Sequence, residues 1–455
     1  MATYLPPGSG AGDDRYLTGR GPAWFAFAMT LGLMLFDYID RQIVVSLFPH
    51  MKAEWGLSDK QLGALVSIVS ITVAFAALPV ALIADRASRV KSIAIMAGAW
   101  SLATISCMFT RNYGQLLAAR AVVGLGEAGY GSVGAALIAS VFPARMRGTL
   151  LAAFFATASV GSVLGVLLGG LIAAHWGWRA AFGVVGVPGL LAALLYLKVR
   201  DYQTVALTPA LDQVTRSTGS TVAYVARSLA RSRTMLWVCL GGAAQLVVVS
   251  AVWSWLPSFL NRVHGLAPDQ AAVRAALVVL VGAAGSVVWG SLVDRAGLSR
   301  PKIKLFVLAA LCVASMAVLL PTFGATGTLA APAQFALIAL GGFLMTCSVG
   351  PVSAIVIDVI HPGVRATGAS VLALIQNLLG LAAGPFLVGA LSDSVGLDHA
   401  LAAIPLFGAV AAGFFLLASR TYEGEKQRVA DAALAVEAAG APGPAAAPTL
   451  GGRHA

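Results

Sequence analysis

The hydrophobic residues of this chain gather into twelve long apolar runs, which alternate with shorter polar segments. About 20 apolar residues suffice for a helix to cross the hydrocarbon core of a bilayer. The runs occupy residues 22–47, 58–84, 91–110, 115–141, 147–173, 180–198, 234–260, 271–293, 303–321, 332–358, 366–392 and 399–419. A polar stretch after the sixth run separates six from six. The pattern therefore predicts an all-α membrane protein with twelve transmembrane helices in two six-helix bundles.

The polar segments delimit the other parts of the chain. Near its end, at 221–233, the central polar stretch mixes apolar and basic residues, as a short interfacial helix would. The C-terminal region is rich in Ala, Pro and Gly, a composition that favours disorder. The predicted parts are a cytoplasmic N-terminal tail, a first bundle, a cytoplasmic linker, a second bundle and a disordered cytoplasmic tail, at residues 1–21, 22–198, 199–233, 234–420 and 421–455.

The basic residues indicate the orientation of the chain. When residues at the ends of the runs are assigned to the adjacent loops, 22 of the 30 Lys and Arg residues lie on the side of both termini and 6 on the opposite side, and Arg41 and Arg120 lie deep within runs. Short cytoplasmic loops of membrane proteins carry the excess of Lys and Arg. Both termini are therefore predicted to be cytoplasmic, and the expected location is a bacterial inner (plasma) membrane. The net charge of +11 is then an orientation signal, and no nucleic-acid partner is expected.

The composition supports the membrane assignment and argues against an enzyme. Hydrophobic residues make up 58% of the chain and charged residues 11%, whereas soluble domains carry about 25% charged residues. No nucleophile, base and orienting residue recur together, and no phosphate-binding glycine loop follows a strand. The four cysteines lie inside apolar runs without metal-ligand spacing and are predicted to be buried hydrophobes. No cofactor and no metal are expected, and the chain is predicted to be a monomer.

The two halves of the chain share landmarks in the same order. Asp85-Arg86 follows the second apolar run, and Asp294-Arg295 follows the eighth, an offset of 209 residues. Arg147 follows the fourth run and Arg365 the tenth, an offset of 218 residues. Similar offsets at two landmarks indicate duplication of a six-span unit. Paired halves around a central site are a design of secondary transporters.

The residues around the first of these landmarks resemble a known signature. Asp85-Arg86 with Arg89 resembles the motif between spans 2 and 3 of the major facilitator superfamily, although Ala81 and Ser88 stand where glycine is usual. The segment Arg120–Gly124 resembles the span 4 motif of that superfamily. Span 5 resembles its glycine-rich counterpart through Gly161, Gly165, Gly169 and Gly170. The resemblance covers roughly residues 22–420 and implies the major facilitator fold, with two pseudo-symmetric six-helix bundles.

Two further motifs resemble one subgroup of the superfamily. Asp37-Tyr-Ile-Asp-Arg41 in span 1 and Arg120-Ala-Val-Val-Gly-Leu-Gly-Glu-Ala-Gly-Tyr130 in span 4 resemble the spinster group. That resemblance implies proton-linked movement of amphipathic molecules, including lysolipids or sphingoid lipids in some members. The organic-anion:cation symporters carry a similar acidic-Arg pair in span 1 and a similar Gly-Glu in span 4. The motifs alone leave both groups open.

Charged residues inside two spans are the candidates for chemistry. Each costs roughly 2.5–3.5 kcal/mol on insertion scales, so such residues usually face a cavity or a partner. In span 1, Asp40 and Arg41 follow Asp37 by three and four residues, which places all three near one helical face. In span 4, Arg120 and Glu127 are seven residues apart, nearly two turns, and also share a face.

The depths of these residues predict how they pair. Asp40 and Arg120 should lie at similar depth, and we predict that Asp40 and Arg41 share an ion-pair network with Arg120. Glu127 lies deeper and is the first candidate for the proton-coupling residue, with Asp40 second. A poorly hydrated site favours the protonated carboxyl and a nearby arginine favours the carboxylate, so titration can fall near working pH. The alternative is a permanent ion pair that only locks the helices together.

The candidate substrate-binding residues come from both halves. The first half contributes charged residues and one tyrosine, and the second half, whose spans hold no Lys or Arg away from their ends, contributes neutral ones. They are Asp37, Arg41, Arg120, Tyr130, Gln245, Trp253, Gln376 and Asn377. Asp37 has an alternative role as a solvated cavity residue, and Trp253 and Trp255 as interfacial anchors. A charged wall opposite a neutral one suits a molecule with a polar head and an apolar body.

The repeated Asp-Arg landmarks are candidates for a gate. A carboxylate at a cytoplasmic helix end can pair with the N-terminus of another helix. We predict that Asp85 pairs with the start of span 11 and closes the inner gate, since this contact would bridge the halves. The predicted gating residues are Asp85, Arg86, Arg89, Asp294 and Arg295. The alternative is a role in the loop turn and in topology.

These observations lead to one functional hypothesis with two alternatives. The chain is predicted to be a secondary active transporter that moves a small amphipathic organic molecule, lipid-like or an organic acid, by alternating access. A proton or another ion is expected to drive it, because no ATP-binding domain is present. The alternatives are a proton-linked organic-anion symporter and, from another class, a transporter-derived membrane sensor without flux.

Overall fold

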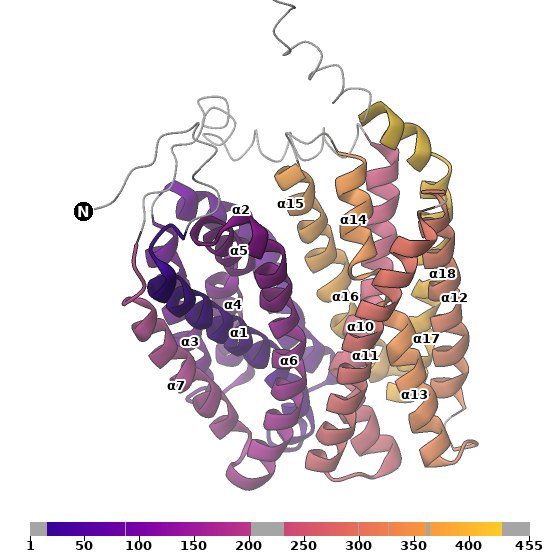
Figure 1. Cartoon of the computed structure of the whole chain (residues 1–455). Coiled ribbons are helices and arrows are strands. Elements are labelled where there is room, and N and C mark those ends of the chain that lie inside the picture. Colours follow the sequence, from indigo (N-terminus) through magenta and orange to yellow (C-terminus); the bar gives the residue numbers. More distant parts are fainter. Residues whose placement is uncertain are drawn as a thin grey trace, which may run out of the picture.

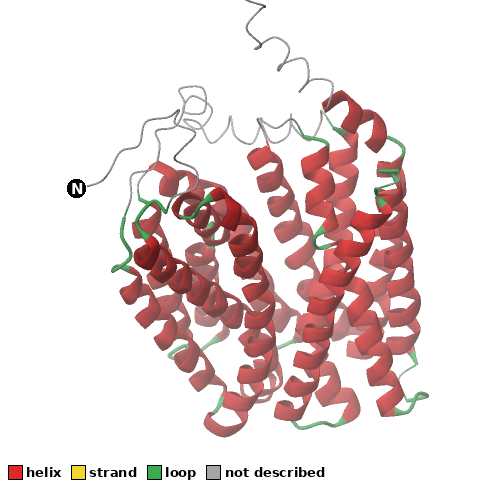
Figure 2. Cartoon of the chain, in the orientation of Figure 1, coloured by secondary structure: helices red, strands yellow, loops and turns green. Residues whose placement is uncertain are grey.

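The computed structural model describes residues 16–86, 88–201, 232–298, 300–325, 327–360 and 365–429. Within these ranges the regular structure is helical and no strand occurs (Figure 2). Twelve helical segments are long and apolar enough to cross a membrane, and each overlaps one of the predicted spans. The twelve-span all-α prediction is therefore confirmed. Most of the predicted linker, with the interfacial helix at its end, and most of the C-terminal tail lie outside the described residues.

The first half of the chain forms seven helices that build the first six spans (Figure 1). They are α1 (Arg20–Trp55), α2 (Asp59–Arg86), α3 (Arg89–Cys107), α4 (Tyr113–Glu127), α5 (Tyr130–Val141), α6 (Ala144–Trp176) and α7 (Trp178–Tyr196). Helix α1 continues eight residues past the end of the predicted span. It ends where Gly56 adopts a left-handed conformation, with φ of 62°.

The second half builds the remaining six spans from more pieces. They are α10 (Arg233–His264), α11 (Pro268–Ala296), α12 (Ile303–Gly324), α13 (Ala331–Met345), η1 (Thr346–Ser348), α14 (Pro351–Asp358), α15 (Arg365–Ile375), η3 (Gln376–Leu381), α16 (Ala383–Val395), α17 (Leu397–Ala403), η4 (Ile404–Leu406) and α18 (Phe407–Ser419). Segment η3 is a π-helical turn between α15 and α16, and η1 is a 3₁₀ turn. These irregular turns divide the tenth and eleventh spans, which the sequence pattern predicts as continuous.

The fourth and tenth spans break at related positions. Helix α4 ends at Glu127, and Gly129, with φ of 81°, separates it from α5. In the second half, α13 gives way to η1 at Thr346, and Pro351 then starts α14. Ala128 and Thr346 are separated by the same offset of 218 residues as the loop landmarks Arg147 and Arg365. The breaks therefore belong to the duplicated unit.

The two halves lie side by side and are joined at the end opposite the termini, which we call the distal side (Figure 1). There α6 packs on α11 and α2 packs on α16. A Cβ atom added at Gly63 of α2 would collide with the Pro385 carbonyl of α16, and one at Gly389 of α16 with the Asp59 carbonyl of α2. Glycine at these positions therefore lets the backbones of opposite halves touch.

The buried apolar side chains form three cores. One core on the distal side draws residues from both halves, for example Phe48 of α1 and Trp255 of α10, whose rings are 5.1 Å apart. Towards the termini each half has its own core, around Trp100 in the first half and around Phe415 in the second. Among the described residues, the core that both halves share therefore lies on the distal side. The four cysteines are buried and free, as their positions in apolar runs predict.

The chain remains helical beyond the twelfth span, up to Val429. Glu425 accepts hydrogen bonds from the Ser232 hydroxyl at 2.5 Å and from the Arg233 amide at 3.1 Å, so it caps the start of α10. The Tyr422 hydroxyl donates to Asp358 Oδ2 at 2.6 Å. Burial and the adjacent carboxylate raise the pKa of Tyr422, which keeps this phenol a donor. The predicted disordered tail from 421 is wrong for residues 421–429, because these contacts order them.

Candidate functional site

A stripe of glycines on α6 sets the position of α1. Gly161, Gly165 and Gly169 are four residues apart and face successive backbone carbonyls of α1. A Cβ atom on any of the three would collide with the carbonyl oxygen of Leu35, Ile39 or Ile43, respectively. The helices approach closely because these side chains are absent. At 3.6 residues per turn, Asp37, Asp40 and Arg41 then fall on the side of α1 that faces away from α6.

Glycines of the span 4 motif position Glu127 in the same way, by allowing close helix packing. Gly124 faces Val69 and Thr72 of α2, and Gly126 faces the backbone of Trp100 on α3. Close packing against two helices fixes the rotation of α4 and directs Glu127, its last residue, towards α1. The break that follows Glu127 is compatible with membrane depth because it is enclosed by protein.

The charged residues of α1 and α4 form two adjoining ion-pair groups. In the first, Arg120 Nη1 lies 3.4 Å from Asp40 Oδ1, and the Thr104 hydroxyl donates to Asp40 Oδ2 at 2.8 Å. In the second, Arg41 Nε donates to Asp37 Oδ1 at 2.9 Å, and Arg41 Nη2 lies 3.1 Å from Glu127 Oε2. The predicted contact between Asp40 and Arg120 is confirmed.

The prediction that Asp40 and Arg41 share one ion-pair network with Arg120 is wrong in detail, because Arg41 belongs to the other group. Arg41 contacts Asp37 one turn earlier on its own helix and Glu127 across the gap to α4. The rotation of α1 about its axis decides this pairing, because it turns Asp40 towards Arg120 and turns Arg41 towards Glu127. Sequence spacing places the three residues on one face but does not resolve which of them faces which partner.

The cluster carries an excess of negative charge when all its members are ionised. It contains three carboxyl groups and two guanidinium groups, those of Asp37, Asp40, Glu127, Arg41 and Arg120. The three carboxylic residues and Arg120 are at most 3% exposed. Full ionisation leaves a net charge of −1 in a buried site, and one bound proton cancels it. Buried charge without compensation is costly, so the carboxyl groups of this cluster are the candidates to hold a proton.

Glu127 is the carboxyl group with the fewest contacts. Within the described part of the chain, neither of its oxygens has a hydrogen-bond partner of good geometry, although Arg41 lies 3.1 Å away. Asp40 and Asp37 each accept at least one hydrogen bond. The Arg41 side chain is 19% exposed, the most of the cluster, and its guanidinium carbon lies 5.5 Å from the Tyr38 ring centroid. Arg41 therefore connects the buried carboxyl groups to accessible space.

Tyr130 takes a packing position in the core of the first half. Its hydroxyl donates to the Thr30 carbonyl at 2.6 Å, and its ring contacts Trp100 at 5.2 Å between centroids. It is fully buried. A substrate contact at this residue stays a prediction.

The four neutral candidates of the second half have different surroundings. Gln245 is buried and donates to the Met345 carbonyl at 2.9 Å, which ties α10 to α13. Gln376 and Asn377 begin η3, and Asn377 Nδ2 donates to the Ala373 carbonyl at 2.8 Å. Trp253 is partly buried, and its indole N–H has no partner among the described residues. The substrate contacts predicted for these four residues stay predictions.

The alternative role of Trp255 as an interfacial anchor is wrong. Trp255 is fully buried, and its indole N–H donates to the Pro385 carbonyl at 2.9 Å. Trp255 is buried because protein surrounds α10, whose membrane-crossing stretch is 78% buried. Hydropathy locates such a tryptophan near a helix end but does not show which helices surround it.

The predicted inner gate falls mostly outside what the structure describes. The side chains of Asp85, Arg86 and residues 365–367 are not described, so the contact between Asp85 and span 11 stays a prediction. Arg89 donates to the Ser140 hydroxyl at 3.0 Å and so braces α3 against α5. Asp294 pairs with Lys304 at 2.9 Å inside the second half, and the Arg295 side chain is exposed.

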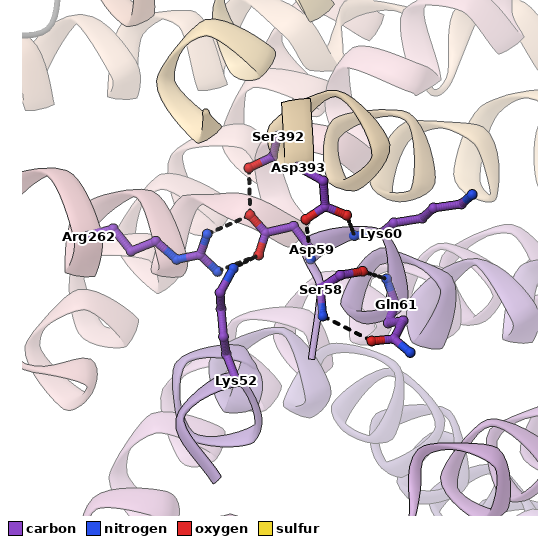
Figure 3. A network of polar contacts seen from close by, with 8 residues as sticks. All are labelled: Lys52, Ser58, Asp59, Lys60, Gln61, Arg262, Ser392 and Asp393. Atoms are coloured by element: carbon purple, nitrogen blue, oxygen red, sulfur yellow. Dashed lines mark hydrogen bonds and ion pairs between the residues drawn. The ribbon is translucent and has the colours of Figure 1, made fainter. Parts of the chain in front are cut away.

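Sequence reasoning missed a polar network that joins the halves on the distal side (Figure 3). Asp59, the first residue of α2, accepts hydrogen bonds from Arg262 at 2.7 and 2.9 Å, from Lys52 at 2.6 Å and from Ser392 at 2.5 Å. Asp393 accepts from the backbone N–H groups of Asp59 and Lys60 at 2.8 and 3.0 Å. In the sequence, Lys52, Lys60 and Arg262 count only as distal loop charges.

Twelve membrane-crossing helices in two halves, with paired charges buried between helices of the first half, define a polytopic membrane transporter. The chain belongs to the Major Facilitator Superfamily, whose sequence profile matches residues 30–385. This family assignment confirms the resemblance carried by the signature around Asp85 and by the motifs of spans 4 and 5.

Known relatives point to the spinster group within that superfamily. Protein spinster of Drosophila melanogaster is 27% identical over 406 residues, which cover 86% of this chain but only 65% of the fly protein. Protein spinster homolog 3 of Danio rerio is 25% identical over 456 residues, which cover 92% of this chain and 89% of that protein. The gallate transporter of Pseudomonas putida is 27% identical over 328 residues, 65% of this chain and 71% of the transporter.

Solved structures show the same fold. The crystal structure of a bacterial homolog of the human lysosomal transporter spinster, in an inward-facing and unoccupied conformation, superposes with a TM-score of 0.79 at 22% identity. It covers 90% of this chain and 99% of the other chain. The D-xylose-proton symporter superposes with a TM-score of 0.63 at 18% identity, over 86% and 96% of the two chains. The chain is thus a major facilitator transporter that is similar to spinster proteins.

Proposed function

We propose that this transporter couples proton movement to the movement of a small amphipathic organic molecule, with Glu127 as the proton carrier and both termini in the cytoplasm. The observation that carries the proposal is the buried five-residue cluster, whose full ionisation leaves one uncompensated negative charge. A single proton on Glu127 balances the cluster. Asp40 is the second candidate, but its contacts with Thr104 and Arg120 favour the ionised form.

Competition for Arg41 links the proton to the substrate. In the ionised state Arg41 is held between Asp37 and Glu127. A proton on Glu127 removes one of these attractions, which leaves the partly exposed guanidinium available to an anionic or polar head group. A head group bound to Arg41 in turn favours the proton on Glu127, because coupling between two sites is reciprocal. Proton and substrate therefore bind together and leave together.

The arrangement of the cores supports access from the terminus side. The halves share an apolar core on the distal side, whereas the cores nearer the termini are separate. With the termini in the cytoplasm, as the excess of basic residues on that side favours, this corresponds to an inward-facing state. Alternating access then requires the distal contacts to part and the terminus-side contacts to form.

The substrate class follows from the contrast between the halves. Charged groups of α1 and α4 would take the polar head, and neutral residues of α10 and the eleventh span would contact the apolar body. The similarity to spinster proteins agrees with a lipid-like molecule. The similarity to a gallate transporter favours the runner-up, a proton-linked organic-anion symporter.

A reconstituted transport assay tests the proposal. Candidate ligands from lysolipids, aromatic acids and dicarboxylates are first ranked by how far they raise the unfolding temperature of the purified protein. Uptake of the ligand that raises the unfolding temperature most is then measured in liposomes that contain the protein, with and without an imposed pH gradient. We expect uptake that follows the gradient and stops when a protonophore collapses it. Binding without counterflow would make the chain a sensor, and uptake indifferent to the pH gradient would remove proton coupling.

A further inference from the structure

The polar network on the distal side joins the two halves through one buried carboxylate. The Asp59 side chain is 3% exposed, and its partners Arg262 and Ser392 belong to α10 and α16 of the second half. Only Lys52 approaches from the first half, at 2.6 Å. Figure 3 shows these side chains converging on the Asp59 carboxylate. The network therefore depends on the two halves being closed on this side.

A second carboxylate completes the first turn of α2 from across the interface. The first N–H groups of a helix lack partners within that helix. At α2, Ser58 and Gln61 cap each other, with Ser58 N to Gln61 Oε1 at 3.0 Å and Gln61 N to Ser58 Oγ at 3.2 Å. The N–H groups of Asp59 and Lys60 bond instead to Asp393, which lies on α16. The Asp393 carboxylate thus reaches the N-terminal end of the α2 dipole only when the halves touch.

Close backbone contact places these groups in register. Gly389 of α16 lies against the Asp59 carbonyl, and Gly63 of α2 lies against the Pro385 carbonyl. One turn deeper, the Ser67 hydroxyl of α2 donates to the Ala382 carbonyl at 2.6 Å. From the distal surface inwards, α2 thus makes a polar contact with the second half at Asp59, close backbone contact at Gly63 and a polar contact at Ser67.

Separation of the halves would remove most of these contacts at once. Asp59 would lose Arg262 and Ser392 but keep Lys52, and Asp393 would lose both backbone donors. Each carboxylate would then be hydrated at the membrane surface, so the open state does not leave a charge buried. A network of this kind can hold the closed state and still release it, unlike a fully buried ion pair.

We propose that Asp59, Arg262 and Asp393 form an outer lock that holds the distal side closed, and that the strength of this lock sets the balance between the two access states. The inference rests on alternating access as proposed above, but it does not depend on which substrate or ion is moved. The positioning residues are Asp59, Arg262 and Asp393, and none of them belongs to the charged cluster of α1 and α4.

Cysteine labelling of purified protein in detergent tests the lock. Ser67→Cys provides the reporter, because Ser67 is 3% exposed at the interface although the terminus-side cores are already separate. In this background Arg262→Gln and Asp393→Ala remove lock contacts from two different helices. We expect each to raise the rate of maleimide labelling about tenfold, a coupling typical of two-state equilibria. The four native cysteines are buried, and chains without the reporter give the background rate.

Arg179→Gln is the matched control. Arg179 pairs with Glu54 on the same side of the molecule, but both residues belong to the first half. Its loss should leave the labelling rate unchanged. Wild-type rates in both Arg262→Gln and Asp393→Ala, or an equal rise in Arg179→Gln, would overturn the lock. Labelling rates are compared only between variants that elute as a monodisperse peak and have equal stability without ligand. If one lock variant does not fold, the other still tests the lock. Flux measurements decide the proposed transport activity separately.

Discussion

At the scale of single residues, Arg41 is the group for which Glu127 and the substrate compete in the proposed mechanism. Its guanidinium is shared between Asp37 at 2.9 Å and Glu127 at 3.1 Å, and it is the most exposed member of the cluster. A guanidinium offers five N–H donors in a fixed plane and remains charged at any working pH. Lysine would supply the charge without this geometry. The cluster therefore needs arginine here to hold two carboxylates and still offer a donor to a third group.

Neutralising Glu127 should separate exchange from proton-driven transport. In Glu127→Gln the side chain keeps its shape but carries no titratable proton. We expect substrate uptake driven by a pH gradient to be lost, while exchange between labelled and unlabelled substrate persists. Counterflow and gradient-driven uptake in the same liposomes measure the two. Glu54→Gln, a carboxylate exposed on the distal surface, is the control and should keep both activities. Proton dependence that survives in Glu127→Gln would contradict the assignment.

The pair of Asp40 and Arg120 should contribute to stability as a unit. Arg120→Met leaves the Asp40 carboxylate buried without its cation, which typically costs about 3–5 kcal/mol. Adding Asp40→Leu removes the orphaned charge, so the double variant should recover a large part of the loss. Unfolding temperatures of the purified variants in one detergent give the comparison. A double variant that is as unstable as the sum of the two single variants would show that the residues act independently.

At the scale of elements, glycine stripes determine how closely helices approach. The α6 stripe brings α6 onto α1 and thereby orients the charged face of α1, and Gly124 and Gly126 do the same for α4. In lipid, helix association relies on such close packing because lipid tails are as apolar as the side chains. The charged cluster is thus positioned by glycines that pack against neighbouring helices.

Two alanine substitutions on α6 test this argument. At Gly165 a methyl group would collide with the Ile39 carbonyl, whereas at Gly148 it would meet open space. Alanine is a better helix former than glycine by about 1 kcal/mol. We therefore expect Gly148→Ala to be neutral or stabilising, and Gly165→Ala to lower the unfolding temperature and the transport rate. Equal behaviour of the two variants would mean that the close contact between α6 and α1 is not required.

The paired breaks in spans 4 and 10 also belong to this scale. One lies directly after Glu127 and the other before Pro351, at equivalent places of the repeat. Hydropathy treats each span as one helix because the residues around the break remain apolar. The left-handed Gly129 interrupts the first span, and the turn from Thr346 to Gly350 interrupts the second.

At the scale of the whole molecule, the two halves make different kinds of contact at their two ends. On the distal side they share an apolar core and the Asp59 network. On the terminus side of the second half, the helix after α18 ties spans together through Tyr422 and Glu425. These contacts brace the second half at the end opposite the distal interface.

Truncations of the C-terminus test the brace. A chain that ends after Arg420 loses the cap on α10 and the hydrogen bond to Asp358, so we expect a lower unfolding temperature and a lower yield. A chain that ends after Val429 keeps both contacts and should match the full-length protein. Thermal unfolding of the two purified truncations decides the matter. Equal stability of both would show that residues 421–429 do not brace the second half.

The sequence by itself determined the number of spans, the duplicated halves and the residue types of the charged cluster. These features depend on local composition and on helical periodicity, which act within one span, and the similar depths of Asp40 and Arg120 followed from counting along two helices. Tertiary structure alone decided that Arg41 contacts Glu127, that span 4 breaks after Glu127, and that Asp59 meets Arg262 and Asp393. Each of these depends on how helices far apart in the chain rotate and pack against one another, and no pattern along a single helix records that rotation.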